Sequence, residues 1–583
     1  MLVDHSKVVA KPGHGNRLNW ASETQPGTGN RKPFSNASGI YLSPFQPLTL
    51  REVTMMRFMN NVTDKPDWTT KVFDESIIAK WKHESVNLPD SIPATQISEP
   101  MFTYCISELQ FRAKEHPNSP NGAIRVYNGD VYKSDTAVSE ETKLALQKAV
   151  RVLEDIPAAQ KDWHPGSDGK ILDLVHPSLF PLIYGTSKIL PIGAPITTLE
   201  DCVKRCGEGE VLPDPKTKEP NLGVRDKDLW STKFQWLPCE VDISGDKPKI
   251  LTYINNLHPQ HHKELYGLME DLIQASIPLW NLALVCSDDL WNTPSRIRYN
   301  TCVFIGDTRV PEQPEPQEFG SNVLKHEFPT NLKEKYGDLP LQVIVKLANI
   351  ELTPEKPEYD GGTWHIEGKL NEAICATALY YYSSENITHS SLAFRHEANI
   401  ESVMDPSWEL GLDAWELEPW ALESQEWLPH VYGLPPDGVM IQDVGSVETC
   451  EGRLITFPNI LQHRVQPFKL ADPTKPGHRK IVALFLVDPT TRIISTADVP
   501  CQRQDWWAEE MLKTSQSSSA KPKLPDPKDR GIHKLPPELQ KIVFDGVDDF
   551  PIGMDKAKEY RKELMEEFLL KHQENFVGGD CTL

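Results

Sequence analysis

The chain has 583 residues, of which 39% are hydrophobic and 25% are charged, the composition of a globular protein long enough for several domains. Lys and Arg number 61 against 83 Asp and Glu, which gives a formal net charge of −22 at pH 7. Because nucleic acids and anionic membranes are bound by clustered positive charge, this acidic balance argues against both as partners.

The first segment, residues 1–45, is rich in Gly, Asn, Ser and Pro and is predicted to be a flexible tail. The chain shows no apolar run of the length that a secretory signal or a membrane span requires. Its ten cysteines are scattered, which is typical of free thiols in a reducing compartment. We therefore expect a cytoplasmic protein.

Helical patterns predominate in residues 46–335. Ser139 is a suitable N-cap residue for a helix that continues to Ile156, because two acids follow it and apolar residues then recur on one face. Residues 261–272 repeat this periodicity. We expect a large, mainly helical N-terminal region that packs on an apolar partner.

Strand-like runs begin near residue 341 and define a second region, residues 336–507. Short β-branched or aromatic runs, separated by Pro, Gly and Asn, predict an antiparallel sandwich or barrel. The runs are residues 341–350, 374–382, 391–396, 439–444, 453–457, 463–468 and 480–487. An insert at 405–430, with four Trp among acidic residues, is either a cover over the sheet edge or a substrate lid.

The last segment, residues 508–583, begins as a polar, linker-like passage. It ends in a predicted amphipathic helix over residues 555–575, with Leu564, Phe568 and Leu569 on one face. We expect this helix to dock back onto the main body.

A candidate metal site begins at Trp364-His365-Ile366-Glu367, which follows a Gly361-Gly362 turn. If this segment is a strand, His365 and Glu367 point to the same side, because side chains two residues apart share a face. A third ligand from another strand would leave open positions on the metal. Two nitrogens and one oxygen with open positions suit Fe(II) better than structural zinc.

The third ligand is predicted to be His463, at the start of the strand that follows a Pro-Asn turn. Further along, Gly477-His478-Arg479 opens the apolar strand over residues 480–487. Arg479 would place a fixed positive charge inside the sandwich, where it could hold one end of a small dicarboxylate while the other end chelates the metal.

These residues together resemble the Fe(II)/2-oxoglutarate-dependent dioxygenases, and most closely the prolyl-hydroxylase-like branch. That family has His-x-Asp/Glu, a distal His and then Gly-x-Arg or Gly-x-Lys, which His365, Glu367, His463, Gly477 and Arg479 match. The resemblance implies a double-stranded β-helix (jelly-roll) core within an α+β fold. It also implies Fe(II) as cofactor and 2-oxoglutarate as co-substrate.

By this resemblance, His365, Glu367 and His463 would hold iron, and Arg479 the far carboxylate of 2-oxoglutarate. Tyr380 and Tyr382 share one strand face and could add a hydroxyl to that carboxylate, and we expect Tyr380 to do so. The stretch over residues 469–476 is interpreted as a lengthened hairpin before Arg479, with Arg464 as the alternative anchor. Along its full length the chain is similar to large fungal proteins that share a domain of unknown function.

The expected activity is hydroxylation of a small-molecule or amino-acid-like substrate with O2. Two alternatives stay open: a cupin-like metalloenzyme that does not use 2-oxoglutarate, and a non-catalytic scaffold that retains the sandwich. His258, His261 and His262 are interpreted as helix-start and surface residues, because the sequence shows no carboxylate partner for them. Cys202 and Cys206 are interpreted as thiols, since a structural zinc site needs a second close pair.

Overall fold

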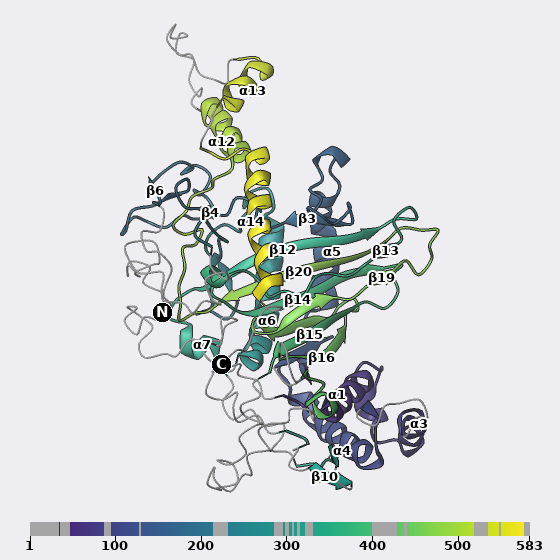
Figure 1. The fold of residues 1–583 in the computed structure, drawn as a ribbon. Coiled ribbons are helices and arrows are strands. Elements are labelled where there is room, and N and C mark those ends of the chain that lie inside the picture. Colours follow the sequence, from purple (N-terminus) through teal and green to yellow (C-terminus); the bar gives the residue numbers. More distant parts are fainter. Residues whose placement is uncertain are drawn as a thin grey trace.

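The computed structural model describes residues 34, 47–86, 95–127, 130–213, 231–284, 295–297, 302–305, 308–311, 315–320, 330–398, 428–435, 440–517, 535–546 and 550–575. These residues form a mixed α/β fold built around antiparallel sheets (Figure 1). None of the helices in these ranges is both long and apolar enough to cross a bilayer. The 1–45 tail and the 405–430 insert lie outside these ranges, apart from Phe34 and residues 428–430.

The main sheet has the strand order β1-β2-β17-β14-β20-β12-β8-β9, and β3 also pairs with β12. Its three long central strands are β12 (Leu341–Leu352), β14 (Ile374–Glu385) and β20 (Gly477–Val487). They read as continuous apolar runs because both of their faces are covered. The shorter strands are β1 (Ile124–Tyr127), β2 (Val131–Ser134), β3 (Ile171–Val175), β8 (Cys239–Asp242), β9 (Lys249–Ile250) and β17 (Leu454–Pro458).

A second, three-stranded sheet packs on one face of the main sheet, which we call the inner face. It has the order β16-β15-β18 and consists of β15 (Ser391–Glu397), β16 (Ile441–Glu448) and β18 (Gln462–Val465). Phe394 and Val447 of this sheet share one apolar cluster with Leu379 and Phe485 of the main sheet. All seven predicted strand runs therefore form strands, and the small sheet lies beside β14 in Figure 1.

Two helices cover the opposite, outer face of the main sheet: α5 (Glu140–Glu154) and α6 (Lys263–Ala283). Ser139 caps α5 as predicted, accepting a hydrogen bond from the backbone N–H of Thr142. The apolar face of α6 is buried against Val482 and Leu484 of β20. Both helices expected from periodicity are therefore confirmed.

The remaining N-terminal helices gather at the far side of the small sheet (Figure 1). They are α1 (Leu50–Thr63), α2 (Trp68–Lys71), α3 (Glu75–Ser85) and α4 (Glu99–Glu115). The region 46–335 is less helical than expected, because it also supplies β1, β2, β3, β8 and β9 to the main sheet. The two regions separated in the sequence therefore share one sheet.

The other short elements are two short helices and several two-stranded ladders around this framework. They are β4 (Leu182–Ile183), β5 (Lys188–Ile189), β6 (Glu210–Val211), β7 (Phe234–Gln235), β10 (Cys302–Ile305), β11 (Thr308–Pro311), α7 (Leu332–Tyr336), β13 (Glu358–Tyr359), α11 (Leu428–Val431) and β19 (Phe468–Lys469).

The C-terminal part adds three helices, α12 (Gln504–Ser517), α13 (Pro537–Asp545) and α14 (Met554–Asn575). The passage read as a linker thus begins inside a helix. The predicted terminal helix is α14, and it docks on the main body, because Leu564 is buried in the inner-face cluster. The side chains of Phe568 and Leu569 lie outside the described part of the chain.

Candidate metal centre

The structure brings His365, Glu367 and His463 together into one cluster. One ligand-type atom from each lies within 4.8 Å of the others. Oε1 of Glu367 is 3.2 Å from Nε2 of His463 and 3.8 Å from Nε2 of His365. The arrangement offers two nitrogens and one oxygen around a common point, as the sequence predicted.

The backbone, rather than strand alternation, produces this convergence. The His365 segment is not a strand; it forms an isolated antiparallel bridge in which His365 and His463 exchange backbone hydrogen bonds of 3.1 and 2.9 Å. Asn459 fixes the next turn by accepting from the Glu367 N–H at 2.9 Å and donating to the Glu367 carbonyl at 2.8 Å. Gly361 has φ +94° and approaches the carbonyl of Val465, a conformation that favours glycine.

The tautomer of His365 suits metal binding. Its Nδ1 lies 2.8 Å from the carbonyl oxygen of Thr363. Because a carbonyl oxygen only accepts, Nδ1 carries the proton and the lone pair of Nε2 faces Glu367. A metal-ligating histidine is commonly oriented by such a bond from its other ring nitrogen.

The charge states in the cluster also suit a cation. Burial lowers the pKa of His365 to about 4, and the charge of His463 lowers it further. For Glu367, burial raises the pKa, but the hydrogen bond from His463 and the charges of both histidines outweigh it and hold the pKa at about 2. At neutral pH His365 is therefore neutral and Glu367 is ionised, the forms that bind metal. The side chain of His365 is 40% exposed, so the cluster is open on one side.

Arg479 lies on the inner face at the start of β20 and is 2% exposed. Its Nη1 donates to Oγ of Ser390 at 2.8 Å and lies 3.4 Å from Oγ1 of Thr449. The guanidinium also lies over the rings of Tyr381 and Phe468, at 5.4 and 5.3 Å. No carboxylate pairs with it among the described residues. Since a buried charge without a counterion is strongly unfavourable, this position suits an anionic ligand.

The structure does not bring Tyr380 to Arg479. Tyr380 lies on the outer face of β14, in the cluster that α5 and α6 cover, and Tyr382 lies there too. Their neighbour Tyr381 faces Arg479 instead, because successive strand residues alternate between faces. Tyr381 pairs with Ile481 of β20, which lies two residues from Arg479 on the same strand. This register places Tyr381 on the face of the sheet that carries Arg479. The sequence did not indicate that Ser390 and Thr449 lie beside Arg479, because neither residue belongs to a recognisable motif.

Arg464, the alternative anchor, does not face the cluster. Its guanidinium lies 4.6 Å from the centroid of the Trp364 ring, and Arg395 stacks there as well, at 4.5 Å. Arg464 follows His463 on β18, so the two side chains point to opposite faces.

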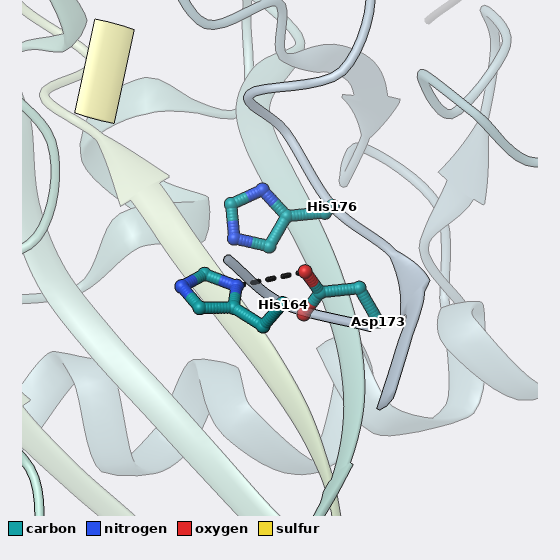
Figure 2. Close-up of side chains that lie close together, drawn as sticks. All are labelled: His164, Asp173 and His176. Atoms are coloured by element: carbon teal, nitrogen blue, oxygen red, sulfur yellow. Dashed lines mark hydrogen bonds and ion pairs between the residues drawn. The ribbon is translucent and has the colours of Figure 1, made fainter. Parts of the chain in front are cut away.

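A second group of two histidines and a carboxylate, His164, Asp173 and His176, was not found from the sequence (Figure 2). Nδ1 of His164 lies 2.8 Å from Oδ2 of Asp173, and the two imidazole rings are 5.3 Å apart at their centroids. Arg561 of α14 approaches the same Oδ2 atom to 3.4 Å. All three members of this group lie between residues 164 and 176, and the C-terminal helix adds only Arg561 beside them.

A third group joins His258 and His261 to Glu509 of α12. Nε2 of His261 is 3.0 Å from Oε1 of Glu509, and both side chains are substantially exposed. The carboxylate partner that the local sequence lacked therefore comes from a distant helix. Cys202 and Cys206 are free thiols, as expected.

Residues 99–510 match the sequence model of a family described as "Protein of unknown function (DUF4246)". Residues 11–84 match the model described as "Domain of unknown function DUF4246, N-terminal". No curated protein matches the chain.

Two solved structures show distant similarity. One is the Fe(II)/(alpha)ketoglutarate-dependent dioxygenase TqaL, with 12% identity and a TM-score of 0.22 over 60% of this chain and 90% of that chain. The other is a bsmA homologue from Methylobium petroleophilum PM1, with 12% identity and a TM-score of 0.16 over 31% of this chain. The match spans 57% of that homologue's length. At such TM-scores the function has to be inferred from the residues of the site.

Proposed function

Because this chain belongs to the DUF4246 family, which is described only as being of unknown function, we propose a function from the site itself. The protein is proposed to be an Fe(II)- and 2-oxoglutarate-dependent dioxygenase that hydroxylates a small-molecule or amino-acid-like substrate. One observation carries this proposal: a cluster of two histidines and a carboxylate shares the interior between the two sheets with a buried arginine that has no carboxylate partner among the described residues.

The donor set fits Fe(II). Nitrogen from His365 and His463 and oxygen from Glu367 would occupy one side of the ion and leave positions for other ligands. The hydrogen bond from His365 to Thr363 supports this assignment, since it directs Nε2 toward the ion. The two packed sheets are proposed to be the double-stranded β-helix (jelly-roll) core that this chemistry uses.

Arg479 is proposed to bind the far carboxylate of 2-oxoglutarate, with the hydroxyl groups of Ser390 and Thr449 beside it. A guanidinium fork matches a carboxylate in shape as well as in charge. Bound Fe(II) and 2-oxoglutarate would supply the oxidative decarboxylation that activates O2 for C–H hydroxylation.

The chain's own residues would orient these groups and limit the access of water. Phe457 lies 4.8 Å from the ring of His463, and Phe394 lies 6.5 Å from it, so apolar rings back the buried ligand. The exposed edge of His365 leaves one approach open for substrate and O2. Exclusion of water strengthens each electrostatic contact inside such a site.

The test is conversion of 2-oxoglutarate to succinate by the full chain with added Fe(II). His365→Ala and His463→Ala are expected to abolish turnover, because each removes one ligand. His389→Ala is the matched control, since that imidazole is 93% exposed and lies before the start of β15. Turnover that survives in both ligand variants contradicts the proposal.

Arg479→Met distinguishes this function from a cupin-like metalloenzyme that uses no 2-oxoglutarate. We expect the variant to retain iron and to lose affinity for 2-oxoglutarate by more than about tenfold, the usual scale for losing one partner of a buried charge pair. Unchanged affinity would favour the cupin-like alternative. Absence of bound iron in the wild-type protein would favour a scaffold.

A further inference from the structure

The inner face of the main sheet carries a second cation besides Arg479, Lys346 of β12. Lys346 pairs with Ala483 of β20, which shares the inner-face cluster, so its side chain belongs to the same face. Ala483 lies four residues beyond Arg479, or about 13 Å along the strand. Within the described part of the chain, Lys346 forms no hydrogen bond or ion pair. Two cations thus lie on one face, separated along β20.

Lys346 lies beside the second histidine–carboxylate group. Leu347 pairs with Val175 and Ala348 with Asp173, so the register places Lys346 next to His176 and close to Asp173. Burial opposes a net lowering of the pKa of Asp173, to which the charges of His176, His164 and Lys346 contribute. The ammonium group is therefore close enough to act on this carboxylate.

Asp173 lies on the same face as Lys346. It pairs with Ala348, two residues after Lys346 on β12, and side chains two apart on a strand share a face. Its Oδ2 atom accepts a hydrogen bond from Nδ1–H of His164 at 2.8 Å (Figure 2). The lone pair of His164 is therefore on Nε2, and the side chain is 20% exposed.

Arg561 of α14 holds this histidine–carboxylate pair in place. Arg561 is buried and pairs with both oxygens of Asp162, at 2.6 and 2.9 Å, besides its approach to Asp173. A carboxylate that is fixed on one side by a guanidinium orients an imidazole on the other. His164 is thus presented as a fixed hydrogen-bond acceptor.

The group is poorly suited to hold a metal. His176 accepts a hydrogen bond at Nδ1 from the backbone N–H of Ser178 at 3.2 Å, so its proton is on Nε2. Arg561 lies 3.4 Å from Oδ2 of Asp173 and would compete with a divalent cation for that carboxylate. An organic ligand with its own hydrogen-bond donor fits these atoms better.

We propose that Lys346 and His164 form a substrate-binding subsite for a small zwitterion of the α-amino acid class. Lys346 binds the carboxylate of the ligand, and Nε2 of His164 accepts a hydrogen bond from its ammonium group. The identification of this ligand as substrate rests on the proposed dioxygenase function; the binding itself does not.

The test is equilibrium binding, by calorimetry, of the twenty proteinogenic L-amino acids to the full chain, each beside the amine that lacks its carboxylate. We expect at least one amino acid to bind and its amine to bind at least about tenfold more weakly. Lys346→Met and His164→Phe are each expected to weaken the binding of that amino acid by a similar factor. Lys356→Met is the matched control, since Lys356 is an exposed residue that pairs with Asp168.

Two outcomes overturn the proposal: none of the amino acids binds, or binding is unchanged in both variants. Each variant is first checked for Co(II) binding at the His365 cluster, and Lys346→Gln replaces Lys346→Met if the latter does not fold. Succinate formation is measured separately. Amino acid binding that depends on Lys346, without any 2-oxoglutarate turnover, would retain the subsite and reject the dioxygenase.

Discussion

Two of the groups in the described part of the chain, those of His365 and of His164, each combine two histidines with one carboxylate, and their surroundings give them different chemistry. In the first group Glu367 is contacted by imidazole nitrogens. In the second group Asp173 is also approached by the guanidinium of Arg561. A divalent cation would neutralise the first carboxylate, whereas the second already has a counterion.

The hydrogen bonds behind the histidines differ in the same sense. His365 donates from Nδ1 to a carbonyl and leaves Nε2 free to ligate. His176 accepts at Nδ1 from a backbone N–H, so Nε2 holds the proton. For His365 and His176, the partner of the remote ring nitrogen therefore decides which nitrogen keeps the lone pair, Nε2 in His365 and Nδ1 in His176.

The largest expected effect comes from removing the counterion of the second group. Arg561→Met leaves Asp162 and Asp173 without their buried partner, so we expect the free energy of unfolding to fall by about 3–5 kcal/mol. Denaturation by urea measures this change. Metal affinity of the folded variant is expected to stay the same, since the hydrogen bonds and ion pairs of Arg561 within the described residues go to Asp162 and Asp173 and not to the first group.

Lys233→Met is the control for this variant. Lys233 pairs with Glu563, which lies on α14 as Arg561 does, but both side chains of this pair are well exposed. Loss of the pair is therefore expected to change the free energy of unfolding by less than about 1 kcal/mol. Equal effects of the two substitutions would contradict the distinct role given to Arg561.

Metal binding itself is the next largest difference between the groups. His365→Ala or His463→Ala is expected to weaken Co(II) or Fe(II) binding more than about 100-fold, equivalent to about 2.7 kcal/mol. His164→Ala and His176→Ala are expected to leave the affinity unchanged. The visible absorption of bound Co(II) measures the affinity of all four variants. Loss of binding in the His164 and His176 variants would mean that the second group, not the first, binds the metal.

A smaller effect is expected from the residue that shapes the first group without contacting the metal. Asn459 holds the backbone of Glu367 on both sides, so Asn459→Ala should weaken metal binding by about 10–100-fold, the range for outer-shell partners. Asn386→Ala is the control, because Asn386 makes comparable backbone bonds in an exposed loop. Equal metal affinities in the two variants would mean that the backbone at Glu367 keeps its conformation without the hydrogen bonds to Asn459.

The sequence predicts the strands well, because their apolar runs are long and bounded by turn residues. It also predicts the meeting of His365, Glu367 and His463, although the His365 segment proves to be a bridge rather than a strand. The choice of Tyr380 failed because alternation along β14 fixes relative faces but not which face is inner.

The second group was not predicted, although part of its signal is local. The bridge between Trp163 and Leu172 joins His164 to Asp173 around the turn residues Pro165-Gly166-Ser167-Asp168-Gly169, whereas Arg561 comes from almost four hundred residues further along the chain. Contacts of this separation depend on how α14 docks, and periodicity shows only that this helix has an apolar face.

The smallest expected effect concerns the protonation of His176. Burial lowers its pKa well below the usual 6.5, and the charge of Asp173 only partly opposes this. The unfolded chain therefore takes up a proton below pH 6.5 that the folded protein refuses, so stability falls as the pH is lowered through this range. The loss is at most about 1.4 kcal/mol per pH unit for one group. His176→Asn removes this term, so the variant should lose about 1 kcal/mol less than the wild type between pH 7 and 5.5.

Asparagine can accept the same backbone bond from Ser178, so the substitution changes the titration more than the packing. Urea denaturation at the two pH values measures the difference, with the exposed His389→Asn as control. Asp173 also favours stability at higher pH through its lowered pKa, but even its ordinary pKa of 3.8 lies below this pH range. If the wild type and His176→Asn respond equally to acid, His176 accepts its proton in the folded state. A doubly protonated imidazole has no lone pair on Nδ1 to accept the Ser178 N–H. The contrast between the group of His176 and the group of His365 would then rest on Arg561 alone.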